Sequence, residues 1–229
     1  MTPVRNAATL ELVGGSLCLD FTNTVNSWLE TKRDYLATYD DFLAWAEHAG
    51  AISSADRSAL AARAVADPGA ADAALSAARD RRAEICHVLG GVSDGDVPAD
   101  ELASLMAAHA EALAAASYEG GSDGFRPAWR VADDLAAPLL PITNDAGALL
   151  LSAEVSRVRT CPSCGWLFLD RSRNGRRRWC SMETCGSRTK MRRYRRKRVA
   201  RTAVTPAGAA PGERPSGLRG ARTGAAPRP

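Results

Sequence analysis

Four of the chain's six cysteines lie between residues 161 and 185, and this cluster constrains the fold more than any other feature of the sequence. In the pattern C-x2-C-x15-C-x4-C they are Cys161, Cys164, Cys180 and Cys185. Two close pairs separated by about 15 to 20 residues is the spacing expected of a tetrahedral thiolate zinc site. Sulfur can fill all four positions and residues 157–201 contain no histidine, so no position is left for a reactive water. The sequence therefore predicts one structural Zn²⁺.

Three other uses of these cysteines have to be weighed. Two disulfides would need an oxidising compartment, but the N-terminus lacks the basic region and apolar run of a secretory signal. No stretch approaches the roughly 18 apolar residues of a membrane span, so we expect a cytoplasmic chain with no membrane partner. An iron–sulfur cluster fits the basic surroundings less well than zinc. A thiol-based redox sensor, with zinc bound in its resting state, remains an alternative.

The residues between the cysteines predict the local structure that presents them to one ion. The expected elements are a knuckle over residues 161–165, a strand over 166–169, a hairpin turn at Asn174-Gly175 and a returning strand over 178–180. A helix should begin near residues 181–184 and run to about Val199. Together these elements make a small, treble-clef-like α+β zinc finger. The metal stabilises it, because about 45 residues cannot build a sufficient core alone.

Basic charge is concentrated in the same segment. Residues 1–156 carry 10 Lys and Arg against 23 Asp and Glu, whereas residues 157–201 carry 16 against 2. Like charges four residues apart on a helix repel one another, so this density implies an anionic partner. Arginine predominates over lysine, which suits bidentate contacts to phosphate. A membrane surface would require an apolar helix face, which is missing, and double-stranded DNA is the partner we expect.

The residues expected to contact nucleic acid lie on the hairpin and the helix of the finger. They are Arg171, Arg173, Arg176, Arg177, Arg178, Arg188, Lys190, Arg192, Arg193, Arg195 and Arg196. Structured RNA is the alternative partner, because basic zinc ribbons also bind RNA and the aromatic residues of the hairpin could stack on bases.

Residues 1–156 have the pattern of a compact, mainly α-helical domain rich in alanine. The apolar periodicity and the capping residues predict helices over residues 38–50, 53–66, 68–89, 96–117 and 135–153. Gly90-Gly91 is expected to end the third of these helices. Residues 118–131 interrupt the helical pattern with Gly, Ser and Asp, and they predict a short hairpin.

The chain is therefore expected to contain a helical domain at 1–156, a zinc finger at 157–201 and a disordered tail at 202–229. In the tail, 17 of 28 residues are Ala, Gly or Pro. The tail therefore has too few large apolar side chains to offset the entropy lost on ordering. If these are separate domains, the finger should unfold without its metal while the helical domain stays cooperatively folded.

The motif GGSLCLDFTNT at residues 14–24 opens the helical domain and contains Asp20, Asn23 and Thr24. Such polar residues commonly cap a helix or bind nearby backbone. The other interpretation is that they line a pocket for a small-molecule effector.

Residues 157–198, above all FLDRSRNGRRRWCSMETCGSRTKMRRYRRK, resemble the CGNR-type zinc finger found at the C-terminus of bacterial transcription regulators. The motif at 14–24 is similar to the opening of the ABATE domain, which usually precedes that finger. By position, the resemblance assigns zinc binding to the same four cysteines. Ser187 stands where the Cys-Gly-Asn-Arg motif has Asn. Both residues can cap a helix, but Ser cannot make the bidentate amide contact to adenine.

The resemblance implies a DNA-binding finger joined to a helical domain of a stress-induced regulator family. We therefore expect a bacterial transcription regulator whose helical domain acts as a sensor or an assembly module. No pairing of a nucleophile with a base is visible, so we expect no enzyme activity. An RNA- or ribosome-associated protein and a thiol-based redox sensor are the alternatives.

Overall fold

The computed structural model describes residues 6–30, 33–122 and 124–203. The chain divides into two compact units, Met1–Thr189 and Lys190–Pro229, so the clustered cysteines and the helices before them belong to the same unit. Of the tail predicted to be disordered, residues 204–229 lie outside the described residues. Residues 202–203 are the last two of a helix.

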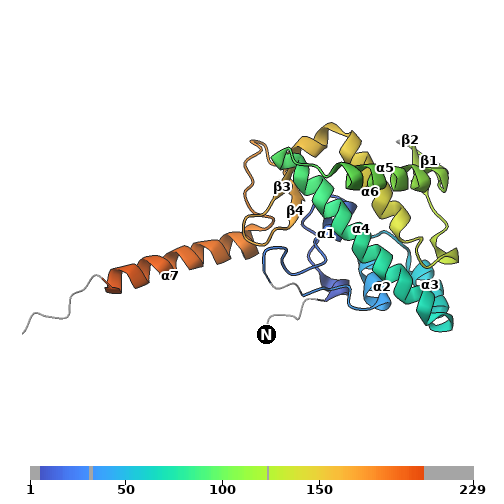
Figure 1. The fold of residues 1–229 in the computed structure, drawn as a ribbon, viewed down its shortest axis with the longest axis horizontal. Coiled ribbons are helices and arrows are strands. Elements are labelled where there is room, and N and C mark those ends of the chain that lie inside the picture. Colours follow the sequence, from blue (N-terminus) through green and yellow to red (C-terminus); the bar gives the residue numbers. More distant parts are fainter. Residues whose placement is uncertain (1–5, 31–32, 123, 204–229) are drawn as a thin grey trace, which may run out of the picture. The chain divides into compact units, whose positions relative to one another are not determined.

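The first unit is mainly helical up to the cysteine cluster, as predicted (Figure 1). Its helices are α1 (Leu17–Thr22), α2 (Tyr39–His48), α3 (Ser54–Ala66), α4 (Pro68–Asp94), α5 (Ala99–Ala114) and α6 (Leu139–Leu151). Phe21 of α1 is fully buried with Phe42 and Trp45 of α2. The rings of Phe21 and Trp45 lie 5.1 Å apart, so aromatic packing holds the short α1 against the longer helices.

Helices α2 and α3 begin where their capping residues predict. The Thr38 hydroxyl accepts a hydrogen bond from the Asp41 N–H at 3.1 Å, and the Asp41 carboxylate accepts one from the Thr38 N–H at 2.9 Å. Ser53 and Asp56 make the same reciprocal pair at the start of α3. Each pair satisfies backbone N–H groups that have no partner inside the helix.

The prediction that Gly90-Gly91 ends α4 is wrong. The helix continues past both glycines and is capped by Gly95, whose φ of 72° is left-handed. Gly91 instead permits close packing: a Cβ there would lie 2.3 Å from the Asp96 carbonyl oxygen, where the chain turns back just after the helix. Gly90 differs, because a Cβ there would face Leu167 at 3.8 Å, an ordinary contact distance.

Residues 118–131 contain the predicted hairpin. Strands β1 (Ser117–Gly121) and β2 (Gly124–Ala128) pair antiparallel, with Glu119 opposite Arg126. Just after the hairpin, the indole N–H of Trp129 donates to the Ala112 carbonyl at 2.7 Å. This bond anchors the end of the hairpin to α5.

The first cysteine pair lies between the two strands of a second antiparallel sheet. Strands β3 (Val158–Thr160) and β4 (Leu167–Leu169) pair antiparallel, and they lie beside α1 and the C-terminal end of α4 (Figure 1). The turn at Gly175 forms as expected, since its N–H donates to the Ser172 carbonyl at 3.1 Å. The chain then returns without forming a strand, so the expected pairing of residues 178–180 with residues 166–169 is wrong.

The two edges of β4 explain this difference. Phe168 is the partner of Arg159 in β3. On the other edge, Leu169 donates its N–H to the Gly14 carbonyl at 2.7 Å, and the Leu167 backbone binds an asparagine side chain of the N-terminal region. The edge that a hairpin would need is therefore already used by the start of the chain.

After Cys180, the first cysteine of the second pair, the chain forms a π-helical turn (Met182–Gly186) and then α7 (Ser187–Ala203). The π-helical turn and α7 together begin and end close to the bounds predicted for one helix, from residues 181–184 to about Val199. The small two-stranded sheet of β3 and β4 at the cysteine cluster and a helix after it thus give the α+β composition that the sequence predicts for this segment.

Candidate metal centre

The first cysteine pair sits on a tight knuckle between β3 and β4. The Cys161 N–H donates to the Trp166 carbonyl at 2.8 Å, and the Gly165 N–H donates to the Cys161 carbonyl at 2.8 Å. Gly165 has a φ of 77°, a conformation that glycine adopts without steric cost. The turn residues that the sequence points to therefore build the loop that holds Cys161 and Cys164.

The second pair is presented by the returning chain and the π-helical turn. Ser181 caps this turn, accepting the Thr184 N–H on its hydroxyl at 3.3 Å and the Gly186 N–H on its carbonyl at 3.0 Å. Cys180 precedes the cap and Cys185 lies inside the turn. The five-residue spacing thus places both sulfurs on the same side of one local structure.

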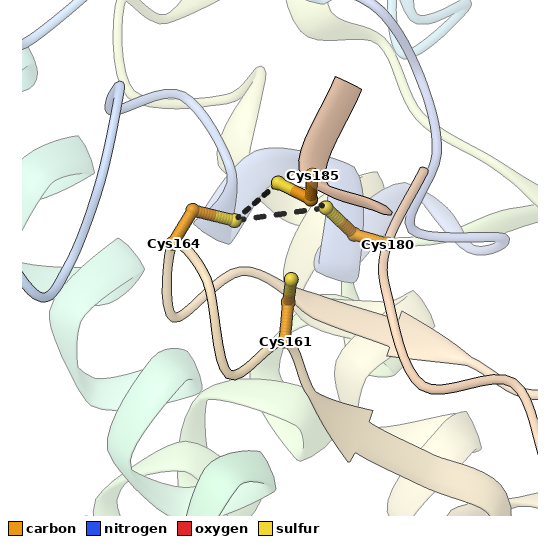
Figure 2. A group of neighbouring side chains, drawn as sticks. All are labelled: Cys161, Cys164, Cys180 and Cys185. Atoms are coloured by element: carbon orange, nitrogen blue, oxygen red, sulfur yellow. Dashed lines mark hydrogen bonds between the residues drawn. The ribbon is translucent and has the colours of Figure 1, made fainter. Parts of the chain in front are cut away.

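All four Sγ atoms converge from these two segments, as Figure 2 shows. They lie within 4.8 Å of one another, and the four residues are buried. Three of the Sγ–Sγ separations, those among Cys164, Cys180 and Cys185, are 3.6 Å. A disulfide needs about 2.0 Å, so these are thiols rather than cystines.

The sulfur positions fit a zinc ion. A tetrahedron with zinc–sulfur bonds of about 2.3 Å has sulfur–sulfur edges of about 3.8 Å, close to the separations in the cluster. Four thiolates are also the donor set that structural zinc prefers. Cys161, Cys164, Cys180 and Cys185 thus constitute a centre for one structural zinc ion, which cross-links the knuckle to the π-helical turn.

Asp170, which the sequence analysis missed, organises the loop between the cysteine pairs. Its side chain is fully buried and accepts the N–H groups of Ser172 and Arg177, both at 2.9 Å. Burial acts to raise the pKa of Asp170, but the hydrogen bonds outweigh it and the pKa lies below its usual value. One signal was available, because Asp170 and Glu183 are the two acidic residues of this basic segment.

Arg177 is built into the same loop. Its guanidinium lies 4.7 Å from the centre of the Phe168 ring, and it donates to the Trp179 carbonyl at 3.1 Å and to the Cys180 carbonyl. These bonds fix the backbone that carries the third cysteine. Arg177 is one of the residues expected to contact nucleic acid, but its guanidinium is bound to the backbone of the protein itself.

The other predicted basic residues lie on the surface. Those of the loop that are exposed are Arg171, Arg173, Arg176 and Arg178. Arg171 pairs with Glu154 at 3.2 Å, and Arg178 lies over the Trp179 ring at 5.4 Å. The exposed residues of α7 are Arg188, Lys190, Arg192, Arg193, Arg195 and Arg196. These side chains lie on more than one face of the helix, and α7 contains no acidic residue.

Asp20, Asn23 and Thr24 are all buried, and their polar groups bind other parts of the protein. Asp20 accepts the Gly14 N–H at 2.7 Å, and burial raises its pKa to about 6. The Asn23 amide exchanges two hydrogen bonds with the Leu167 backbone. The Thr24 hydroxyl donates to the Phe21 carbonyl at 2.7 Å. These contacts favour the structural interpretation of the motif over the effector pocket.

Comparison with known protein families agrees with this description. Residues 157–198 match the family model of the CGNR zinc finger. Residues 15–153, more than half of the chain, match the ABATE family, whose description is "Putative stress-induced transcription regulator". The chain therefore belongs to the ABATE family and carries a CGNR zinc finger C-terminal to the ABATE domain. No curated protein matches the sequence.

Neither family is one of enzymes: one is a family of regulators and the other a zinc finger. Among the residues that the structure describes, no helix is both long and apolar enough to span a bilayer.

Proposed function

We propose that the protein regulates transcription in the cytoplasm by binding double-stranded DNA through its zinc-stabilised basic finger. The observation that carries this proposal is the surface of α7, where six exposed Arg and Lys residues between Arg188 and Arg196 occur without any acidic residue. Its large apolar residues are Met191, Tyr194 and Val199; the first two share a face of the helix, but all three are more than half exposed. A helix of this kind has no apolar stripe to bury, and its charges repel one another until a polyanion neutralises them.

The exposed arginines of the loop, Arg173, Arg176 and Arg178, add basic charge to the surface of the first unit. Guanidinium groups form paired hydrogen bonds with phosphate oxygens, so these residues would position the finger along the DNA backbone. Zinc contributes by fixing the loop and the start of α7 in one structure. The ion would be structural, since four thiolates leave no open coordination position.

The salt dependence of binding tests this proposal. We expect the affinity of the full-length protein for duplex DNA to fall steeply with salt, because each phosphate contact releases counterions. Replacing four exposed arginines of α7 (Arg192, Arg193, Arg195 and Arg196) with Gln should flatten the log–log slope by about 0.9 for each contact removed. The matched control is Arg130→Gln, an exposed arginine of the helical region, which should leave the slope unchanged.

A flat salt dependence in the wild-type protein would contradict phosphate contacts. Competition at one salt concentration separates the two nucleic acids. If structured RNA displaces duplex DNA from the protein, the proposal of a DNA-binding regulator is wrong and an RNA-binding role replaces it.

The helical region would then act as the sensor or assembly module of the regulator, in keeping with the description of its family. The genomic fragments that the purified protein selects should lie near genes whose transcripts change when the protein is removed. Selected fragments that bear no relation to the changed transcripts would contradict regulation of transcription.

A further inference from the structure

The carbonyl group of one zinc ligand is held by the N-terminal part of the chain. The Trp28 N–H donates to the Cys164 carbonyl at 2.8 Å, and the Ser27 hydroxyl donates to the same oxygen at 3.2 Å. Ser27 is buried and more than 130 residues away in sequence. Two donors on one carbonyl fix the position of the ligand loop from outside the finger.

The strand that follows this ligand is held in the same way. The Asn23 amide donates to the Leu167 carbonyl at 2.8 Å and accepts the Leu167 N–H at 3.0 Å, replacing a neighbouring strand. The indole N–H of Trp166 donates to the Val25 carbonyl at 2.7 Å. All of these groups are buried, so any of them would be costly to leave without a partner.

The two segments are also in close steric contact. A Cβ on Gly165, in the knuckle, would lie 2.8 Å from the Cβ of Trp28. Only a residue without a side chain allows the backbones to come this near. The glycine after the second cysteine therefore serves both the turn of the knuckle and the approach of the N-terminal segment.

The N-terminal segment is in turn fixed to α4. Arg82, buried within α4, donates to the Thr24 hydroxyl at 2.9 Å and to the Asp34 carboxylate at 2.7 Å. Asp34 and Val25 form an antiparallel β-bridge. A continuous set of hydrogen bonds thus runs from the ligand Cys164 through the segment to the longest helix of the unit.

We propose that residues 13–28, here called the clasp, are the outer part of the zinc centre, so that metal binding and the packing of the helical region are coupled. With zinc bound, the knuckle presents the Cys164 carbonyl, and the edge of β4 that does not pair with β3, in the positions that the clasp requires. Without zinc, those partners move and the buried groups of the clasp lose their hydrogen bonds. By linkage, a clasp that closes only on the ordered knuckle also tightens the binding of zinc. The coupling does not depend on what the finger binds.

Hydrogen exchange on the full-length chain tests the coupling directly. Amide exchange is compared between the zinc-loaded protein and the reduced protein after a chelator has removed the metal. We expect peptides covering residues 13–28 to lose protection together with those covering residues 157–186. Helix α3, which makes no described hydrogen bond to the finger, is the internal reference. If residues 157–186 lose protection while the clasp keeps it, the proposal is overturned.

A substitution in the clasp tests the reverse direction. Asn23→Ala should bind zinc about 10- to 100-fold more weakly than the wild-type protein in competition with a chromogenic chelator, the range known for residues that support metal ligands. Asn6→Ala is the matched control, since Asn6 is exposed and its side chain bonds to Thr9. Equal zinc affinities for both variants and the wild type would refute the coupling. Should Asn23→Ala fail to fold, the exchange comparison on the wild-type chain still decides.

Discussion

Arg176 and Arg177 are adjacent in sequence but have different surroundings. Arg176 is exposed, whereas the guanidinium of Arg177 binds the backbone around Cys180 and stacks on Phe168. At the scale of single residues, the basic segment therefore combines two roles. Some arginines hold the zinc loop in place and others are free to meet a ligand in solution.

This difference predicts opposite effects for the two substitutions. Arg177→Gln should lower the free energy of unfolding by about 1.5 to 3 kcal/mol, because its charge-assisted hydrogen bonds to the carbonyls of Trp179 and Cys180 are lost. Arg176→Gln should leave stability within about 0.5 kcal/mol and weaken DNA binding. Denaturant unfolding and DNA titration of both variants measure the two effects. Equal stability of the two variants would contradict the role assigned to Arg177.

Asp20 predicts a dependence on pH. Burial raises its pKa from 3.8 to about 6, so the folded chain holds this proton more tightly than the unfolded chain. The stability that Asp20 contributes is then complete below about pH 4 and is lost as the pH rises through about 6. Asn cannot ionise, so the Asp20→Asn variant lacks this loss of stability. Its unfolding free energy minus that of the wild type should rise by about 1 kcal/mol between about pH 5 and pH 7. A constant difference over this range would contradict the raised pKa.

At the scale of elements, glycine has two roles along α4. Gly95 ends the helix with a left-handed conformation, whereas Gly91 lies inside it against the Asp96 carbonyl. Sequence reasoning treated Gly90-Gly91 as a helix stop. Two adjacent glycines do not by themselves distinguish a helix stop from a site inside the helix against which the next residues turn back, and here the helix ends only at Gly95.

The two neighbouring glycines provide a matched pair of substitutions. Gly91→Ala should destabilise the protein by about 1 to 3 kcal/mol, because its Cβ would overlap the Asp96 carbonyl oxygen. Gly90→Ala meets Leu167 at an ordinary 3.8 Å and should stabilise the helix by about 0.5 to 1 kcal/mol. Thermal unfolding of both variants tests this, and a stabilising Gly91→Ala would show that the close approach is absent.

Much of the local structure could be predicted from the sequence. The capping residues Thr38 and Ser53 locate the starts of α2 and α3, and the cysteine spacing identifies the four zinc ligands. The partner of β4 could not be predicted. An Asn-Gly turn favours a hairpin, but the edge of the strand is taken by Gly14 and Asn23, more than 140 residues away. Such pairings depend on the tertiary fold, which local propensities do not contain.

At the scale of the whole molecule, zinc has a larger role than stabilising a small finger. The sequence predicts a finger that loses its structure alone when the metal is removed. The clasp predicts instead that the helical region loosens with it, because residues 13–28 share their buried hydrogen bonds with the ligand loop. A regulator built in this way would connect the state of its thiolate centre to the domain that precedes it.

Native mass spectrometry of the purified full-length chain determines whether the four cysteines hold one zinc ion. We predict a single species carrying one zinc ion per chain, and a chain without bound zinc for the Cys180→Ser variant. A wild-type chain that carries iron, that carries no metal, or that has lost four hydrogens to two disulfides would contradict the claim.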